Sequence, residues 1–141
     1  MTINQIQDQI VEEFTELEDW MDRYALLIEL GGEVPPLEDS EKKNEHLIEG
    51  CQSRVWIVCN EQDGVMQLKA DSDALITKGI AALMLRVFDQ QPPCEVAKAD
   101  LYFIEQIGFK EHLSPTRSNG LMSMVATIKQ KATLMCATQK V

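Results

Sequence analysis

Cysteine and histidine are the residues of this chain best suited to covalent or metal chemistry, and there are six of them. They are Cys51, Cys59, Cys94, Cys136, His46 and His112. The cysteines are widely and irregularly spaced, without a C-x-x-C pair, and the histidines do not complete a zinc-finger spacing. The sequence therefore indicates no metal site, and each thiol has to be interpreted separately.

Cys51 has the sequence context of a reactive thiol. Gly50 precedes it and has no side chain, so the reactive group of another molecule can approach the sulfur closely. A thiol with an ordinary pKa of about 8.5 needs only modest help from a cation to act as a nucleophile near neutral pH. A lone cysteine is also commonly a small buried hydrophobe, and the spacing alone leaves both interpretations open.

The other three cysteines are expected to do no chemistry. Cys59 continues a predicted strand and is assigned to the core. Cys94 follows two prolines and Cys136 lies near the end of the chain, so both are interpreted as incidental. Disulfides are not expected, because thiols stay reduced in the cytosol.

The elements on either side of Cys51 are predicted to be a long loop and a strand. Residues 33–49 contain Pro35, Pro36 and many charges, which predicts a loop. Residues 53–59 are rich in β-branched and aromatic side chains, which predicts a strand, and residues 65–70 return after a turn that ends at Gly64. Cys51 is therefore expected where a loop meets a strand.

Apolar residues at three- and four-residue steps predict helices before this hairpin. Thr2–Gln5 has the pattern of a capping box and begins the first helix. The same pattern at residues 15–18 predicts the start of a second helix, which is expected to end at Gly31–Gly32 with a left-handed C-cap.

Further helices are predicted after the hairpin. One follows residues 71–73, any of which can cap it, and is expected to be buried against the sheet with Gly79 allowing close approach. Another is predicted over residues 95–107, and a last one from Leu121 onward, after a turn-rich loop at 114–120. The order of helices, hairpin and helices predicts a single α+β domain over residues 1–141.

The charge of the chain argues against nucleic acid as a partner. The formal charge is −10, from 23 acidic and 13 basic residues, and much of the excess lies near the start. Such a field repels phosphates, so we expect no nucleic-acid binding. The acidic face either steers a basic patch on a protein partner or is simply solvated surface.

The sequence also argues against membrane insertion and secretion. It has no apolar stretch long enough to span a bilayer, so we expect no membrane association. The first residues lack a basic start followed by an apolar run, so we expect no signal peptide. A cytoplasmic location is therefore expected.

Several motifs resemble the SufE family of sulfur acceptors, which includes CsdE-like proteins. The segment at 50–56, GCQSRVW, is similar to the family signature. Further matches follow in the same order: Leu30-Gly31 with Pro35 and Leu37, then ADSDALITKG at 70–79 and HLSPTRSNGL at 112–121. The resemblance covers about residues 20–135. It implies a three-stranded antiparallel sheet flanked by helices, as in IscU-type scaffold proteins.

The resemblance also implies a function. Cys51 matches the cysteine on which the family accepts persulfide sulfur from a cysteine desulfurase, here of the SufS or CsdA kind. The acceptor stimulates the desulfurase and relays the sulfur to a downstream scaffold for iron–sulfur cluster assembly. No cofactor is expected, because pyridoxal phosphate belongs to the desulfurase. The protein would be a sulfur-transfer accessory protein rather than a stand-alone enzyme.

Five further residues are assigned to the site by the same resemblance. Gly50, Gln52 and Ser53 flank the cysteine in its loop. Arg117 matches an arginine whose cation would lower the thiol pKa or hold the transferred sulfur, and it would equally be a solvated surface residue. Asp73 is interpreted first as a helix cap and second as a residue that shields Cys51. His46 is given no role.

Three other functions compete with sulfur acceptance. A cluster scaffold needs several thiolates that converge on a metal, and the other cysteines lack ligand spacing. A cysteine hydrolase needs a positioned base, and neither histidine is accompanied by an evident triad. The main alternative is a binding module that activates a desulfurase allosterically without carrying sulfur.

Overall fold

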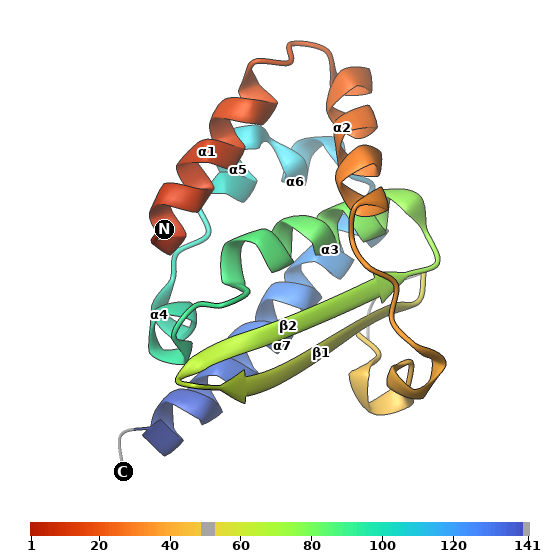
Figure 1. Ribbon diagram of the computed structural model, residues 1–141. Coiled ribbons are helices and arrows are strands. Elements are labelled where there is room, and N and C mark those ends of the chain that lie inside the picture. The colour runs from red at the N-terminus through yellow and green to blue at the C-terminus, as the bar shows by residue number, and fades with distance from the viewer. Residues whose placement is uncertain (49–52, 140–141) are drawn as a thin grey trace.

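The computed structural model describes residues 1–48 and 53–139, in which helices pack around one β-hairpin (Figure 1). The elements are, in chain order, α1 (Ile3–Thr15), α2 (Trp20–Gly32), the 3₁₀ turns η1 (Asp39–Glu41) and η2 (Asn44–His46), β1 (Val55–Gln62), β2 (Val65–Ser72), α3 (Leu75–Phe88), α4 (Pro93–Lys98), α5 (Phe103–Ile107), α6 (Phe109–His112) and α7 (Pro115–Gln139). The predicted α+β class, with helices flanking an antiparallel sheet, is confirmed.

The hairpin turns at Asp63-Gly64. Both residues have positive φ, 54° and 84°, and Gln62 pairs with Val65 across them. Positive φ at both central residues is the geometry of the two-residue turns that match the twist of a hairpin, and Asp-Gly is a favoured sequence for it. The predicted turn is confirmed, but both strands extend beyond their predicted ends.

The expected third strand is not found in the described residues. Leu47 forms only an isolated antiparallel bridge with Trp56, next to which the Ile48 N–H donates to the Val55 carbonyl at 2.8 Å. The reason is the path of the preceding segment, because the turns η1 and η2 leave only its last residues alongside β1. Over residues 1–48 and 53–139 the sheet therefore has two strands.

One face of the hairpin forms one side of the main hydrophobic core. Alternate residues of the two strands, Val55, Ile57, Met66, Leu68 and Ala70, are buried there. α3 packs on β2 and α7 on β1, and the rest of α3 contacts α1 and α2 (Figure 1). The predicted burial of α3 against the sheet is confirmed.

Helices α2 and α3 cross at two glycines. A Cβ on Gly79 would lie 2.7 Å from the carbonyl carbon of Leu27, and one on Gly31 would lie 2.8 Å from the backbone nitrogen of Gly79. The close approach predicted for Gly79 is confirmed. The helix ends at Gly32, as predicted, but the predicted left-handed cap is wrong, because neither glycine has positive φ and the C-cap residue Glu33 has right-handed geometry.

Three predicted helix boundaries are also wrong. α2 starts later than predicted, because the Asp19 side chain accepts a hydrogen bond from the Met21 N–H and caps it. The helix predicted at 95–107 is divided between α4 and α5 by residues 99–102. The region 114–120 is helical rather than a loop, since Pro115 occupies the first position of α7 and Ser114 Oγ accepts from the Arg117 N–H at 3.4 Å.

The second face of the hairpin is covered by residues 33–47, whereas Ile48 is buried in the main core. Leu37 and Leu47 pack there on Trp56 and Val58, which forms a small apolar cluster separate from the main core. The segment predicted as a loop is therefore fastened over the sheet, and it leads directly to residue 49 and the predicted site.

The cysteine predictions are partly confirmed. Cys59 packs against the main core, as expected. The expectation that Cys94 and Cys136 are incidental free thiols is wrong, because their sulfurs are bonded and their Cα atoms lie 4.8 Å apart. The contacts of α4 with α7 bring together two cysteines 42 residues apart, which spacing in the sequence could not show.

Among the described residues no helix has both the length and the apolar character needed to cross a membrane.

Candidate functional site

Three of the predicted site residues, Gly50, Cys51 and Gln52, lie outside the residues that the structure describes. The chain on either side of them is held to the sheet. On the N-terminal side the Ile48 N–H donates to the Val55 carbonyl, and on the C-terminal side the backbone of Arg54 forms hydrogen bonds with Asp73. Ser53, the fourth predicted residue, is half-buried next to Arg54. The site is thus bounded by two anchored chain ends.

Asp73 anchors the second of these ends. Its Oδ1 accepts from the Arg54 N–H at 3.0 Å, and its own N–H donates to the Arg54 carbonyl at 3.2 Å. The preferred interpretation of Asp73 as a helix cap is wrong, because Ala74 occupies the N-cap position of α3 without a side-chain cap. Ser72 assists, since its Oγ donates to the Arg54 carbonyl at 2.8 Å and accepts from the Ala74 N–H at 3.2 Å.

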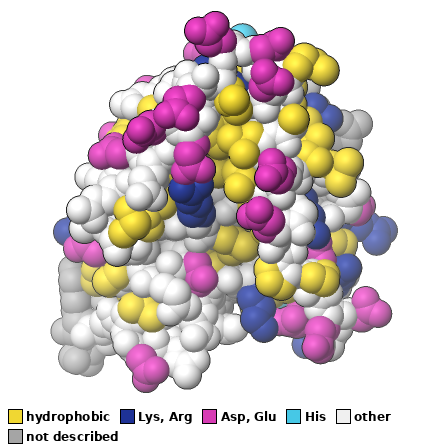
Figure 2. Space-filling model, turned by 45° about the horizontal axis from the view of Figure 1, so that its top comes forward, with side chains coloured by type: hydrophobic (Ala, Val, Ile, Leu, Met, Phe, Trp, Pro, Cys, Tyr) yellow, Lys and Arg dark blue, Asp and Glu magenta, His cyan; other side chains and the backbone are white. Residues whose placement is uncertain are grey.

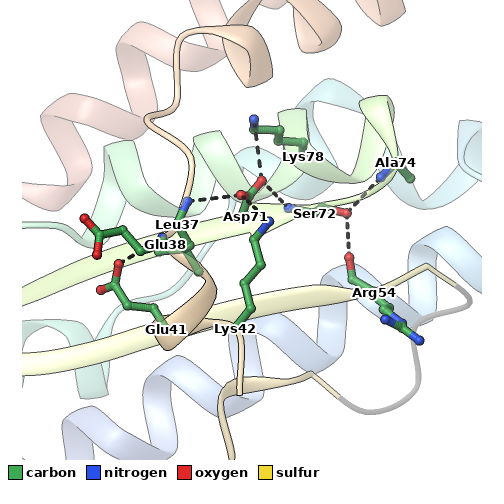
Figure 3. Close-up of polar contacts among 9 residues, drawn as sticks. All are labelled: Leu37, Glu38, Glu41, Lys42, Arg54, Asp71, Ser72, Ala74 and Lys78. Atoms are coloured by element: carbon green, nitrogen blue, oxygen red, sulfur yellow. Dashed lines mark hydrogen bonds and ion pairs between the residues drawn. The ribbon is translucent and has the colours of Figure 1, made fainter. Parts of the chain in front are cut away.

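Asp71 is a buried carboxylate that fastens the segment leading to the site (Figure 3). Its Oδ2 accepts from the Leu37 N–H at 3.1 Å, and its Oδ1 accepts from the Ser72 N–H at 2.8 Å. Lys42 and Lys78 each place Nζ 3.5 Å from one of its oxygens. The carboxylate therefore joins the covering segment, β2 and α3 in one network.

The protonation of Asp71 is shifted by this network. Burial alone would raise the pKa of the carboxyl, but the hydrogen bonds from Leu37 and Ser72 and the charges of Lys78 and Lys42 outweigh burial and lower it. The folded pKa is thus below the ordinary value of 3.8. The stabilisation is complete above 3.8 and is lost as the pH falls through the lower folded value.

We expect Asp71→Asn to destabilise the fold by about 2 kcal/mol at pH 7, because the amide loses both ion pairs and turns an NH₂ group toward one of the backbone donors. Urea unfolding should show this difference in full near neutral pH and a smaller one below pH 3.8. Asp63→Asn is the matched control, since Asp63 is exposed and asparagine tolerates its positive φ. A difference that stayed constant down to acid pH would contradict the role given to the charge.

Lys42 connects this network to the apolar cluster. Its ammonium lies 5.4 Å from the centroid of the Trp56 ring while it pairs with Asp71. Trp56 and Asp71 are directly opposite each other on the two strands, so the same face carries both. Sequence reasoning treated Asp71 only as a candidate helix cap. The alternation of side chains along the strand indicated which face of the hairpin carries Asp71. Nothing in the sequence indicated that another segment of the chain covers that face.

Arg117 lies in the first turn of α7 and is exposed. Its side chain forms no ion pair with any residue in the described part of the chain. At the other end of α7, Gln139 donates to Glu61 at 3.0 Å and to the Gly64 carbonyl at 3.3 Å, beside the hairpin turn. The first turn of α7 therefore lies toward the end of the hairpin where β1 starts (Figure 1).

The remaining candidate groups have structural roles. Burial raises the pKa of the Cys59 thiol to about 11, although Lys131 opposes this, so Cys59 is a poor nucleophile at neutral pH. The His112 ring stacks on Trp20 with centroids 4.1 Å apart. His46 Nε2 lies 3.6 Å from the carboxylate of Glu45. Within residues 1–48 and 53–139, no group of three histidine, cysteine or acidic side chains is placed to hold a metal ion.

Much of the acidic excess of the sequence gathers on one part of the surface. Figure 2 shows acidic side chains across the upper part of the molecule, where α1 and α2 lie, with hydrophobic side chains between them. The exposed acidic residues of α1, α2 and the turn between them include Asp8, Glu12, Glu16, Glu18, Asp19 and Asp22. This surface would repel polyanions and attract a basic partner.

Comparison with known proteins identifies the family. The model of the SufE family, described as an Fe–S metabolism associated domain, matches residues 8–132. The chain belongs to the SufE family. Membership of the SufE family implies a role in Fe–S metabolism as an acceptor of sulfur that works with a desulfurase.

A relative and a solved structure agree with this assignment. An uncharacterized SufE-like protein of Rhizobium etli is 39% identical over 135 residues, which are 92% of this chain and 91% of that protein. The solution structure of a hypothetical protein from Thermus thermophilus has a TM-score of 0.77 at 21% identity and covers 94% of this chain and 96% of its own. The second likeness shows that the fold is shared. The SufE match spans both Asp71 and Arg117 as well as the cysteine between the anchored ends.

Proposed function

We propose that Cys51 accepts a sulfur atom as a persulfide from a cysteine desulfurase and passes it to a scaffold for iron–sulfur cluster assembly. The observation that carries this proposal is the SufE family match, which includes Cys51 within GCQSRVW at 50–56. The protein acts in the cytoplasm as an accessory to the desulfurase, which it stimulates by removing sulfur from it.

The transfer is an exchange between a thiolate and a persulfide. The Cys51 thiolate attacks the terminal sulfur of the persulfide on the desulfurase cysteine, and the S–S bond of that persulfide breaks. A new S–S bond forms on Cys51, and the desulfurase cysteine leaves as a thiolate. The number of S–S bonds is unchanged, so the step needs no oxidant or reductant.

The surrounding residues are proposed to help in three ways. Gly50 leaves space beside the sulfur, and Gln52 and Ser53 form the chain that contacts the partner. Arg117 stabilises the thiolate or the transferred sulfur as an anion, because its cation is exposed and unpaired with the described residues. Asp73 holds the chain end at Arg54 through two hydrogen bonds.

Mass spectrometry tests the proposal directly. The protein is incubated with a desulfurase and cysteine, the thiols are blocked, and the peptide that contains Cys51 is measured. We expect this peptide to gain the mass of one sulfur atom, and treatment with a dithiol reductant to remove it. The matched control is the Cys59 peptide, which should gain nothing, because Cys59 is half-buried against the core and the pKa of its thiol is raised to about 11. Sulfur on Cys59, or on neither peptide, would contradict the proposal.

A further inference from the structure

A disulfide joins the start of α4 to the last turn of α7. Cys94 is the second residue of α4, and Cys136 lies shortly before Gln139, where α7 ends. Their Cα atoms are 4.8 Å apart, within the range that a disulfide requires. Cys94 is half-buried and Cys136 is 9% exposed, so Cys94 is the more accessible residue of the pair.

Other contacts at this end of the molecule also join separate elements. The Lys129 ammonium donates to the Ala99 carbonyl, so α4 is fastened to α7 at its far end as well. The Gln90 N–H donates to the Met66 carbonyl at 2.8 Å, which ties the chain just before α4 to β2. Gln139 connects the end of α7 back to the hairpin turn. The disulfide adds a covalent link to these hydrogen bonds.

This end of the molecule lies away from the proposed sulfur site. α4 and the end of α7 lie on the side of the molecule where the hairpin turns, whereas residues 53 and 73 lie where β1 starts and β2 has ended (Figure 1). A chemical change at Cys94 and Cys136 therefore alters how α7 is held without contacting the residues assigned to sulfur transfer.

We propose that Cys94 and Cys136 are a reversible redox site, oxidised by a small-molecule disulfide and reduced by small thiols, that controls how firmly the end of α7 is held. In the oxidation, the Cys94 thiolate attacks the small disulfide, forms a mixed disulfide and releases one thiolate. The Cys136 thiolate then attacks Cys94 in the mixed disulfide and releases the second. The small disulfide is reduced to two thiols as the protein pair is oxidised, so the electrons balance.

The oxidised and reduced forms should differ in stability. The bond closes a loop with a sequence separation of 42, and a link of this length removes conformational entropy from the unfolded chain. We expect the oxidised protein to melt on the order of 10 °C higher than the reduced protein. The capacity of Cys51 to gain sulfur should be the same in both.

The test uses the full chain in buffers with different ratios of reduced to oxidised glutathione, followed by alkylation and peptide mass measurement. Across these ratios we expect the Cys94 and Cys136 peptides to change together from two alkylated thiols to one linked pair that lacks two hydrogens. A reductant should lower the melting temperature of both the wild type and Cys59→Ser. Cys136→Ser and Cys94→Ser should have the melting temperature of the reduced wild type, and a reductant should not change it.

Several results would overturn the proposal. One is that both thiols remain alkylated at every ratio, and another is that the bond survives excess reductant in the folded protein. A third is that the melting temperature responds equally in Cys136→Ser, which would assign the effect to another thiol. The use of two single variants keeps the test decisive if one of them fails to fold.

Discussion

Replacement of Cys51 by serine should reduce sulfur acceptance to the level seen without any acceptor. A serine hydroxyl is almost entirely protonated at neutral pH and cannot form a persulfide, whereas the thiol has a usable thiolate fraction. The sulfur adduct on residues 50–56 should disappear, and the rate at which the desulfurase produces alanine should fall to its unstimulated value. Alanine release and peptide mass measure the two effects separately.

The same variant separates the proposed acceptor from the allosteric alternative. If stimulation of the desulfurase persists fully in Cys51→Ser, the protein activates its partner by binding alone. Cys59→Ser is the matched control, because Cys59 packs against the core and should leave both readouts unchanged. A pull-down of the desulfurase by both variants shows whether a loss of activity comes from a loss of binding.

Gly79→Ala should cost about 3 kcal/mol of folding free energy, the largest effect that we expect from adding one methyl group. The new Cβ would lie 2.7 Å from the carbonyl carbon of Leu27, and that atom belongs to a helix backbone that cannot rotate away. The helices would have to separate, although the better helix propensity of alanine offsets part of the cost. Urea unfolding monitored by circular dichroism gives the change in free energy.

Gly32→Ala provides the comparison within the same pair of helices. A Cβ at Gly32 would meet nothing within 4 Å, so this change should alter stability by no more than about 1 kcal/mol. Equal effects at the two positions would show that helix propensity, and not the crossing of α2 and α3, determines the response.

Local sequence patterns predicted the elements whose cause is local. The capping box at Thr2 forms as predicted, with its side chain and that of Gln5 bonding reciprocally to the backbone. The Asp-Gly turn and the apolar periodicity of α3 likewise depend on neighbours in the chain. The glycine at Gly31 misled the prediction because a glycine that ends a helix and one that allows another backbone to approach look the same in a sequence.

The rest of the structure depends on contacts between distant residues. Asp71 lies 34 residues from Leu37, and nothing near either one indicates that they bond. The pairing of Cys94 with Cys136 likewise follows from the packing of α4 on α7. For the site, the resemblance indicated Cys51 from its motif, whereas the positions of Asp73 and Arg117 required the fold. Asp73 proved to bind the backbone of Arg54 rather than to cap a helix.

The separation of the two apolar clusters has a consequence for how the protein can respond to a partner. The cluster of Leu37, Leu47, Trp56 and Val58 shares none of its members with the main core. Its few contacts and the Asp71 network can break while α3 and α7 remain packed, so local opening requires less free energy than global unfolding. A docking protein that displaced residues 33–47 from the sheet would therefore leave the main core packed and would lose only the binding energy that this opening consumes.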